Sequence, residues 1–289
     1  MTAPSHRPVF RLTFADGATS PELDPGRPEA LIWLSPVDGS VWAYGDRVDG
    51  ENWLRIPGVA TFRFGGAADE PGEATAIPEA GVPREAVTDA YRRAVLPIAL
   101  HVHGLEVLHA SAVVTPHGVV AFCAESHGGK STIAYACERR GYPVWADDAV
   151  AFHPLPNGAE VVPLPFTLRL RAPASAFFEE PPPDAARPPG HAREDGEPAS
   201  LAAVVILERS RDEAAAVAIE PVPSAQAFAA VFEHAYWFDL RSVEQRRETM
   251  RRYLDLVARV PVHRIRYPTG FDHLPRVADA LGAALAASR

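Results

Sequence analysis

The sequence predicts an α/β fold in its C-terminal two thirds, preceded by a small β-rich region. Two observations carry this prediction. An apolar run at residues 119–124 leads into a loop with paired glycines, and a helix-like stretch follows at residues 131–140. Gly141 and Pro143 then end the helix, and a second strand-like run occupies residues 144–146. Strand, glycine loop, helix and strand in this order are the plan of a parallel α/β unit.

The N-terminal region is expected to form short strands. Between residues 9 and 66, runs rich in β-branched and aromatic residues alternate with turn signals such as Asp16-Gly17 and Asp38-Gly39. These runs are residues 9–15, 30–36, 40–46 and 53–65. Residues 67–83 are rich in Gly, Pro, Ala and Glu and are predicted to form a linker. The predicted domains are therefore a β-rich N-terminal domain at residues 1–82 and a second domain at residues 83–289.

The second predicted domain alternates helices and strands. Apolar residues at Val87, Tyr91, Val95 and Ile98 have helical spacing and predict a helix over residues 83–103. Further expected elements are strands at residues 106–114, 201–207 and 262–267 and helices at residues 224–233, 243–259 and 274–287. Residues 173–198 hold seven prolines, two glycines and six acidic residues. That composition predicts a mobile loop, with a disordered spacer as the alternative.

Composition and charge argue against several classes of function. The formal net charge is −9 and the basic residues form no stripe, so we expect no binding to nucleic acid. The chain has no apolar run of about 18 residues, which argues against a membrane span. Its first residues lack the pattern of a secretory signal. Two cysteines, Cys123 and Cys137, are too few for a disulfide framework, and together these features favour a cytoplasmic protein.

The glycine loop, residues 124–132, carries the clearest chemical signal. It reads AESHGGKST and matches the phosphate-loop pattern G-x-x-x-x-G-K-[ST], with Ala124 in place of the first glycine. Such a loop surrounds phosphates with backbone N–H groups at a helix N-terminus. Lys130 is the only lysine in the chain, and its compact ammonium would neutralise the β- and γ-phosphates of ATP. The Ser131 hydroxyl would bind Mg²⁺. The backbone amides would come from Ser126, His127, Gly128, Gly129, Lys130, Ser131 and Thr132.

Two consecutive carboxylates follow this loop. Asp147 and Asp148 lie at the end of the strand-like run, and consecutive strand residues point to opposite faces. One carboxylate can therefore help to hold a metal ion while its neighbour faces the substrate, where a base must take the proton of a hydroxyl. The alternatives are a glycine turn that only caps a helix and an aspartate pair in a solvated turn. The flanking strand and helix and the single lysine favour nucleotide binding.

The chain resembles the catalytic domain of HPr serine kinase/phosphorylase and, more broadly, the HPr kinase-like proteins. The residues that carry the resemblance are LHASAV at 108–113, residues 121–132, Arg140-Gly141-Tyr142 and Ala146-Asp147-Asp148. It is sharp over residues 105–152 and loose from there to the C-terminus. The β-rich N-terminal region does not resemble the N-terminal domain of the bifunctional enzyme. The resemblance implies a P-loop, PEP-carboxykinase-like catalytic domain of α/β class.

The resemblance also implies roles for single residues. Lys130 and Ser131 would belong to the phosphate loop, Asp148 would be the base that accepts the hydroxyl proton, and Asp147 would lie beside it near the metal. His109 matches a histidine placed near the reacting phosphate. Taken by itself, His109 in an apolar strand is more typical of a core histidine.

Four further positions bear on the site. Ala124 and His127 stand where the family has glycine, so this loop departs from the family pattern at two positions. The family's later loop that assists dephosphorylation has no match, so phosphorylase activity is not expected. Arg169 and Arg171 alternate on an expected strand and could reach an anionic group.

These observations predict an enzyme with ATP and Mg²⁺ as its cofactors. It would be a kinase that transfers the γ-phosphoryl group to a serine-type hydroxyl of a peptide or small protein. The resemblance extends to enzymes that phosphorylate ribosomally made peptides such as lasso-peptide precursors. The alternatives are a kinase for a small-molecule alcohol and a nucleotide-binding regulatory module with little turnover. No nucleic-acid or membrane partner is expected, and a homo-oligomer is left open.

Overall fold

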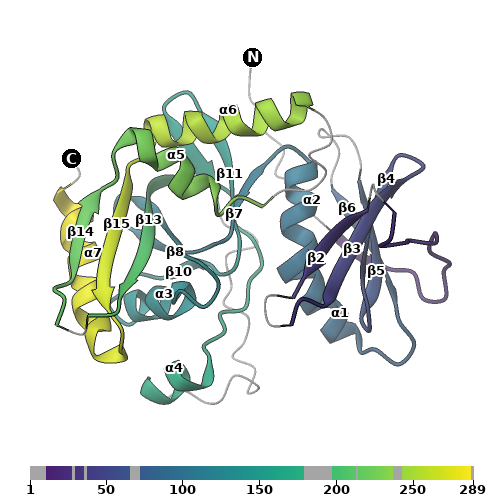
Figure 1. Ribbon diagram of the computed structural model, residues 1–289, viewed down its shortest axis with the longest axis horizontal. Helices are drawn as coiled ribbons and strands as arrows, with labels where there is room; N and C mark the ends of the chain where they lie inside the picture. Colours follow the sequence, from purple (N-terminus) through teal and green to yellow (C-terminus); the bar gives the residue numbers. More distant parts are fainter. Residues whose placement is uncertain are drawn as a thin grey trace. The chain divides into compact units, whose positions relative to one another are not determined.

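The computed structural model describes residues 11–27, 30–35, 38–65, 72–178, 197–212, 214–236 and 243–287 (Figure 1). The described chain is a mixed α/β protein with two sheets. It divides into two compact units, the first ending at Leu105 and the second beginning at Glu106. The predicted boundary lay between residues 82 and 83, whereas by its contacts the helical segment at residues 84–102 groups with the N-terminal sheet.

The first unit contains a six-stranded sheet in the order β1-β6-β5-β4-β3-β2. Neighbouring strands are antiparallel, except that β1 and β6 are parallel. Alternate residues such as Phe62 and Phe64 are buried, as expected for a strand with one covered face. The strands are β1 (Arg11–Phe14), β2 (Leu31–Leu34), β3 (Val41–Val48), β4 (Glu51–Ile56), β5 (Ala60–Gly65) and β6 (Glu73–Pro78).

Strand β6 lies inside the segment that composition predicted to be a linker. Its residues Ala74 and Ala76 are fully buried, and the strand pairs with β5 along its whole length. Strand β6 has the period-two alternation of a strand, but its buried side chains are alanines. Because alanine is only weakly apolar, the alternation is hard to recognise in a segment rich in Gly, Pro, Ala and Glu. The linker prediction is therefore wrong over residues 73–78, while residues 66–71 lie outside the described part of the chain.

The helix predicted over residues 83–103 is confirmed, with an irregular middle. It consists of α1 (Arg84–Ala90), a π-helical turn (Tyr91–Val95) and α2 (Leu96–Val102). The four apolar residues whose spacing predicted it are all buried. Pro97 accounts for the π-helical turn, because proline has no N–H for the helical hydrogen bond and a wider turn accommodates the missing bond.

The second unit contains a nine-stranded sheet. Its main order is β10-β8-β9-β13-β12-β11-β7, with β15 paired to β13 and β14 paired to β15. Strands β9 and β10 are both antiparallel to β8, so they run parallel to each other, as the strand–loop–helix–strand pattern predicted. The strands are β7 (Glu106–Leu108), β8 (Ala110–Thr115), β9 (Gly118–Cys123), β10 (Val144–Ala146), β11 (Val150–Leu155), β12 (Gly158–Val161), β13 (Ala199–Ser210), β14 (Ala218–Pro221) and β15 (Val262–Pro268).

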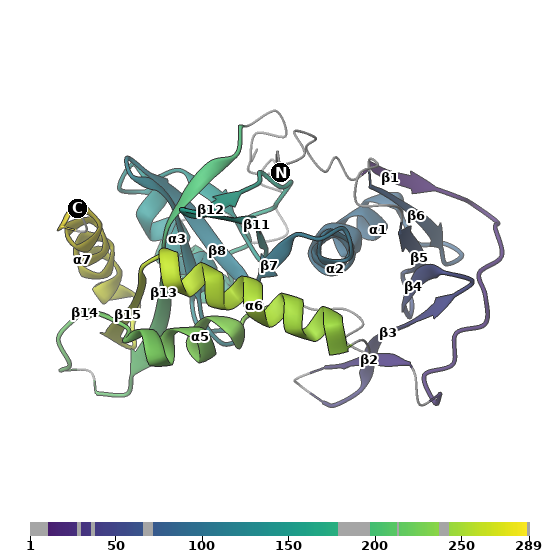
Figure 2. The ribbon, with the colours of Figure 1, turned by 90° about the horizontal axis from the view of Figure 1, so that it is seen from above.

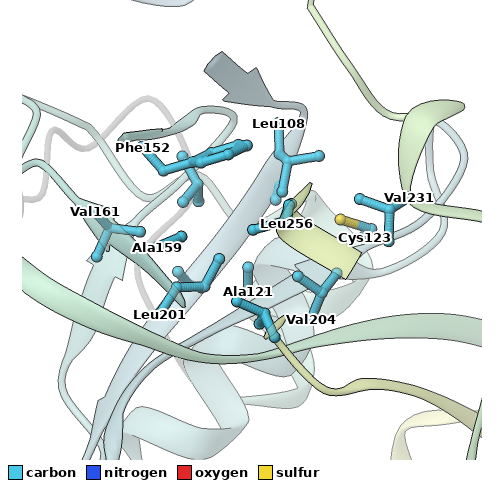
Figure 3. Close-up of a cluster of buried hydrophobic side chains, with 14 of the residues drawn as sticks. Leu108, Ala121, Cys123, Phe152, Ala159, Val161, Leu201, Val204, Val231 and Leu256 are labelled. Carbon is cyan, nitrogen blue, oxygen red and sulfur yellow. The ribbon is translucent and has the colours of Figure 1, made fainter. Parts of the chain in front are cut away.

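Helices cover both faces of this second sheet (Figure 2). Helices α5 (Ser224–Phe232) and α6 (Val243–Arg259) pack on one face, where Val231 and Leu256 join a buried cluster that includes Phe152 and Cys123 (Figure 3). Helices α3 (Lys130–Glu138) and α7 (Leu274–Ala287) pack on the other face. The loop between β9 and α3 therefore starts from a strand that is covered on both sides.

Five elements of the second unit were not predicted: β11, β12, β14, α4 (Ala172–Phe177) and the 3-10 helix η2 (Phe271–His273). Helix α4 opens the segment predicted to be a mobile loop, so that prediction is wrong for residues 173–177, and residues 179–196 lie outside the described part. Pro173 stands in the first turn of α4, where a missing N–H costs no helical hydrogen bond. Within the described residues, no helix is long and apolar enough to span a membrane.

Candidate active site

The loop between β9 and α3 is tight. It begins after Cys123 and ends at Gly129, the N-cap of α3, which has φ +95°. His127 has φ +67°, a left-handed conformation that residues other than glycine rarely adopt. At Gly128 a Cβ atom would lie 2.4 Å from the Cβ of Ala124, so only glycine fits there. Ala124 has no positive φ, and alanine therefore replaces the first glycine of the pattern without left-handed strain.

Two side chains from neighbouring strands hold the outer side of this loop. Arg209, on β13, donates from Nη2 to the carbonyl of His127 and from Nε to the carbonyl of Gly128 at 3.3 Å. The Tyr267 hydroxyl, on β15, donates to the same Gly128 carbonyl at 3.1 Å. Because carbonyl and N–H point in opposite directions across a peptide plane, these bonds turn the N–H of Gly129 toward the other side of the loop. Neither Arg209 nor Tyr267 was predicted, since no local pattern marks a residue that supports a distant loop.

Lys130, the first residue of α3, is buried, with 6% of its surface exposed. Its Nζ donates to the carbonyl of Ala124 at 3.2 Å, across the loop. Burial lowers the pKa of Lys130, and the nearby charge of Asp148 is the largest influence that opposes this shift. The buried Lys130 ammonium lies beside the inward-facing N–H of Gly129. Both groups have lost contact with water, so a bound anion would stabilise them.

Asp147 connects the loop to strand β8. Its Oδ1 accepts hydrogen bonds from the Ser131 hydroxyl at 2.8 Å and from the Ser111 hydroxyl at 2.6 Å. Its Oδ2 accepts the backbone N–H of Arg169 at 3.4 Å. Burial, followed by the charge of Asp148, raises the pKa of Asp147 to about 6. The predicted metal-site residues Ser131 and Asp147 are thus in direct contact, and Ser111 joins them from the sequence stretch that also contains His109.

Asp148 lies in a bend instead of continuing the strand. Strand β10 ends at Ala146, where its pairing with β8 stops, and Asp148 has φ +65°. The chain turns here because it must leave β10 and enter β11 at Val150. The strand alternation on which the prediction of two opposite faces rested does not apply here, because the strand ends before Asp147 and Asp148 is left-handed.

His109 and Tyr236 lie beside this bend. The Tyr236 hydroxyl donates to the backbone carbonyl of Asp148 at 3.4 Å. His109 Nδ1 lies 3.0 Å from the same hydroxyl, and the two rings stack with centroids 5.5 Å apart. The Tyr236 hydroxyl therefore links the His109 ring to the Asp148 carbonyl. The structure thus brings His109 to the backbone of Asp148 through Tyr236, a residue that was not among the predicted site residues.

The remaining predicted residues surround the start of α3. Ser126 and His127 are exposed on the loop, and Thr132 is half-buried in the first turn of the helix. Arg171 donates from Nη2 to His127 Nε2 at 3.1 Å, which brings a second guanidinium to the loop. The expected strand around Arg169 and Arg171 is absent, because residues 162–171 form neither helix nor strand.

Among the described residues, protein side chains alone form no metal-binding cluster, and the two cysteines contribute only packing. Among the described residues, no group of three or more His, Cys, Asp and Glu side chains gathers around one point. Cys123 and Cys137 are free and buried, and burial raises the pKa of each thiol to about 12. Both cysteines therefore pack as small apolar side chains.

Comparisons with known proteins return distant structural likenesses but no match by sequence. No protein-family model matches the sequence, and no curated protein sequence matches it. Among solved structures, the chain is similar to the HPr(Ser) kinase/phosphatase from Coxiella burnetii. The match covers 62% of this chain and 95% of that chain, with 12% identity and a TM-score of 0.33.

Proposed function

We propose that this chain is a magnesium-dependent kinase that uses ATP to phosphorylate a serine-type hydroxyl of a peptide or small protein. One observation carries the proposal. The Ser131 hydroxyl and the Asp147 carboxylate meet at 2.8 Å at the start of α3, next to the buried Lys130. A hydroxyl, a carboxylate and a lysine at the end of a glycine loop are the groups that a magnesium–polyphosphate site combines.

The residues present fit a magnesium–nucleotide group. A Cβ on Gly129 would lie 3.2 Å from Arg209, and one on Gly128 would overlap Ala124. Glycine at both positions therefore leaves the loop backbone open to a phosphate group. Magnesium in such sites is held by hydroxyl and carboxylate oxygens together with substrate phosphates, which suits Ser131 and Asp147. When bound, the ion would neutralise part of the phosphate charge.

We assign Asp148 as the base. Its charge is the main one that opposes the lowered pKa of Lys130, so carboxylate and ammonium lie in one region. There Asp148 would take the proton of the acceptor hydroxyl as its oxygen bonds to phosphorus. Lys130 would stabilise the negative charge of the transferring group. His109, linked to the Asp148 carbonyl through Tyr236, would help to hold the base in place.

Two variants separate nucleotide binding from transfer. Lys130→Ala is expected to weaken Mg-ATP binding about tenfold or more and to abolish transfer, because no other lysine can replace it. Asp148→Asn is expected to keep Mg-ATP affinity within about threefold and to remove transfer, because the amide cannot accept the proton. Calorimetry measures the affinity. Transfer of labelled γ-phosphate into a size-fractionated lysate measures the reaction.

The matched control is Asp272→Asn, which removes an exposed carboxylate from the turn before α7 and should change neither quantity. Transfer that survives Lys130→Ala would contradict the assignment of the loop. Loss of nucleotide binding in Asp148→Asn would make Asp148 a metal ligand instead of the base. Label found only in small metabolites would identify an alcohol kinase, and ATP binding without label in any fraction would favour a regulatory module.

A further inference from the structure

A cavity of about 640 Å³ opens beside the loop, within the second unit. This volume falls in the range of small-molecule sites. Its apolar lining comes from Ala124, Ile206, Leu207 and Ala230, which belong to the loop, to β13 and to α5. The loop residues Ser126, His127 and Gly128 also line it, so the cavity adjoins the proposed nucleotide site and offers room for a second molecule beside it.

The cavity lies at the phosphoryl-transfer end of the loop. Ala124 lines it, and the carbonyl of Ala124 accepts the hydrogen bond from Lys130 Nζ at 3.2 Å. In a phosphate loop the lysine reaches the β- and γ-phosphates, whereas the following helix turn lies nearer the other end of the nucleotide. A molecule in the cavity would therefore approach the γ-phosphate, which is where an acceptor hydroxyl must stand.

His234 supplies an unused polar group in this cavity. His234 follows the end of α5, is 8% exposed and lines the cavity. Within the described part of the chain, only its backbone makes hydrogen bonds, to His109 and Val231, and its ring nitrogens make none. Burial lowers the pKa of His234, so the ring is neutral near pH 7 and offers one donor and one acceptor. The ring lines the cavity, so a ligand hydroxyl there would find both a donor and an acceptor.

The charges around the cavity favour a cationic ligand. Glu125 and Glu233 line it as exposed carboxylates, and no cation of the described chain pairs with either. Arg264 pairs with Glu208, another lining residue, at 3.2 Å, and Arg209 donates to neutral loop carbonyls and keeps its charge. Carboxylates therefore outnumber guanidinium groups in the lining by three to two, and the unpaired Glu125 and Glu233 favour an ammonium group.

We propose that this cavity binds the phosphoryl acceptor, a hydroxyl compound with a small apolar body and a cationic amino group. The inference rests on the proposed kinase function and adds the chemical class of its acceptor. The same chemistry is offered by a free amino alcohol and by a serine next to a basic residue in a peptide. In the reaction, the acceptor oxygen forms a bond to the γ-phosphorus, the bond to the ADP oxygen breaks, and Asp148 takes the hydroxyl proton.

Two matched alcohols test the charge requirement. Leucinol carries a hydroxyl, an isobutyl group and an ammonium, and N-acetyl-leucinol keeps the first two but is neutral. By ligand-observed NMR in the presence of Mg-ADP, leucinol is expected to bind about tenfold more tightly than N-acetyl-leucinol. Equal affinity of the two alcohols, or no binding of either, would overturn the proposal.

Variants then connect this binding to the cavity. Glu233→Gln is expected to weaken leucinol about fivefold and to leave N-acetyl-leucinol unchanged, because only the ammonium meets the carboxylate. His234→Phe is expected to weaken both alcohols, because it removes the hydroxyl partner. Glu244→Gln, on exposed α6 surface, is the charge-matched control and should alter neither. Leucinol binding that is unaffected by Glu233→Gln would contradict the proposal.

Mg-ATP affinity, measured on the same samples, separates the two proposals. Normal Mg-ATP binding without leucinol binding rejects the acceptor cavity and leaves the kinase proposal standing. A fall in Mg-ATP affinity in Glu233→Gln or His234→Phe would instead place the nucleotide in the cavity and overturn the inference. Labelled transfer to leucinol, compared with transfer to the peptide acetyl-Leu-Ser-Lys-amide, distinguishes a free amino alcohol from a basic peptide as the source.

Discussion

Two residues of the site, His127 and Asp148, have left-handed backbone conformations without being glycine. Each such conformation costs about 1 kcal/mol or more and persists only where neighbours hold it. Here Arg171 bonds to the His127 ring and Tyr236 bonds to the Asp148 carbonyl. Strain of this kind concentrates at functional sites.

Tyr236 is a positioning residue, because it reaches Asp148 only through the backbone. Tyr236→Phe removes the hydroxyl that joins His109 Nδ1 to the Asp148 carbonyl at 3.0 and 3.4 Å. We expect kcat to fall about tenfold while Mg-ATP affinity stays unchanged, because the base loses its orientation and the phosphate loop is not altered. Steady-state kinetics with labelled ATP, together with calorimetry, measure this division between kcat and binding.

Tyr142→Phe is the control, since Tyr142 packs with the α3–α7 layer on the other face of the sheet. It should leave kcat unchanged. A Tyr236→Phe protein with normal kcat, or with kcat and thermal stability lowered together, would show that the hydroxyl serves packing alone.

At the scale of elements, the sequence predicts best those elements whose ends carry local signals. Strand β10 and helices α6 and α7 have the predicted bounds, because strong periodicity and glycine or proline end signals define them locally. The missed strands β6, β11, β12 and β14 are short and contain Ala, Pro or Gly, so only pairing with neighbouring strands stabilises them.

The candidate site shows the same division between local and distant information. Lys130, Ser131 and Asp147 were predictable because motif spacing places them at a strand end and a helix start. Arg209 and Tyr236 were not, because they reach the site from positions 79 and 106 residues after Lys130. Tertiary packing alone brings such residues together, and no local pattern encodes their role.

The tightness of the β9–α3 loop leads to a prediction at this scale. Gly128→Ala places a Cβ 2.4 Å from the Ala124 Cβ and 2.8 Å from the Glu125 carbonyl oxygen, so the loop must shift. We expect Mg-ATP affinity to fall about tenfold or more, because the backbone N–H groups lose their common direction. The unfolding free energy should fall by only about 1 kcal/mol, since a surface loop can move.

Calorimetry and urea unfolding measure these two quantities. Gly65→Ala is the matched control, because an added Cβ there meets nothing closer than 3.8 Å. Normal Mg-ATP binding in Gly128→Ala would show that the loop geometry is not what holds the nucleotide.

At the scale of the whole molecule, the second unit contains an ionisable group that the proposed reaction does not use. Glu106, on β7, is 1% exposed and lies 3.1 Å from Arg252 of α6. Burial raises the pKa of Glu106 to about 7, and the charge of Arg252 opposes this shift only in part. Arg252 also pairs with Glu248, so its positive charge is shared between two carboxylates.

This carboxyl makes stability depend on pH. The pKa of Glu106 is about 7 in the folded chain against an ordinary value of 4.5, so the folded state holds the proton more strongly. Its stabilising contribution is complete below pH 4.5 and is lost as pH rises through 7. The shift corresponds to about 3 kcal/mol when ionisation is complete.

Glu106→Gln therefore tests whether this carboxyl makes the stability of the second unit depend on pH. The glutamine keeps the size and hydrogen-bonding capacity of the protonated acid but cannot ionise. We expect the variant to match the parent protein near pH 5 and to be more stable by about 2–3 kcal/mol at pH 8. Urea unfolding at pH 5, 6, 7 and 8 measures the difference, with Glu244→Gln as the exposed control. A constant difference across this range would mean that Glu106 ionises normally despite its burial, and that Arg252 compensates its charge in full.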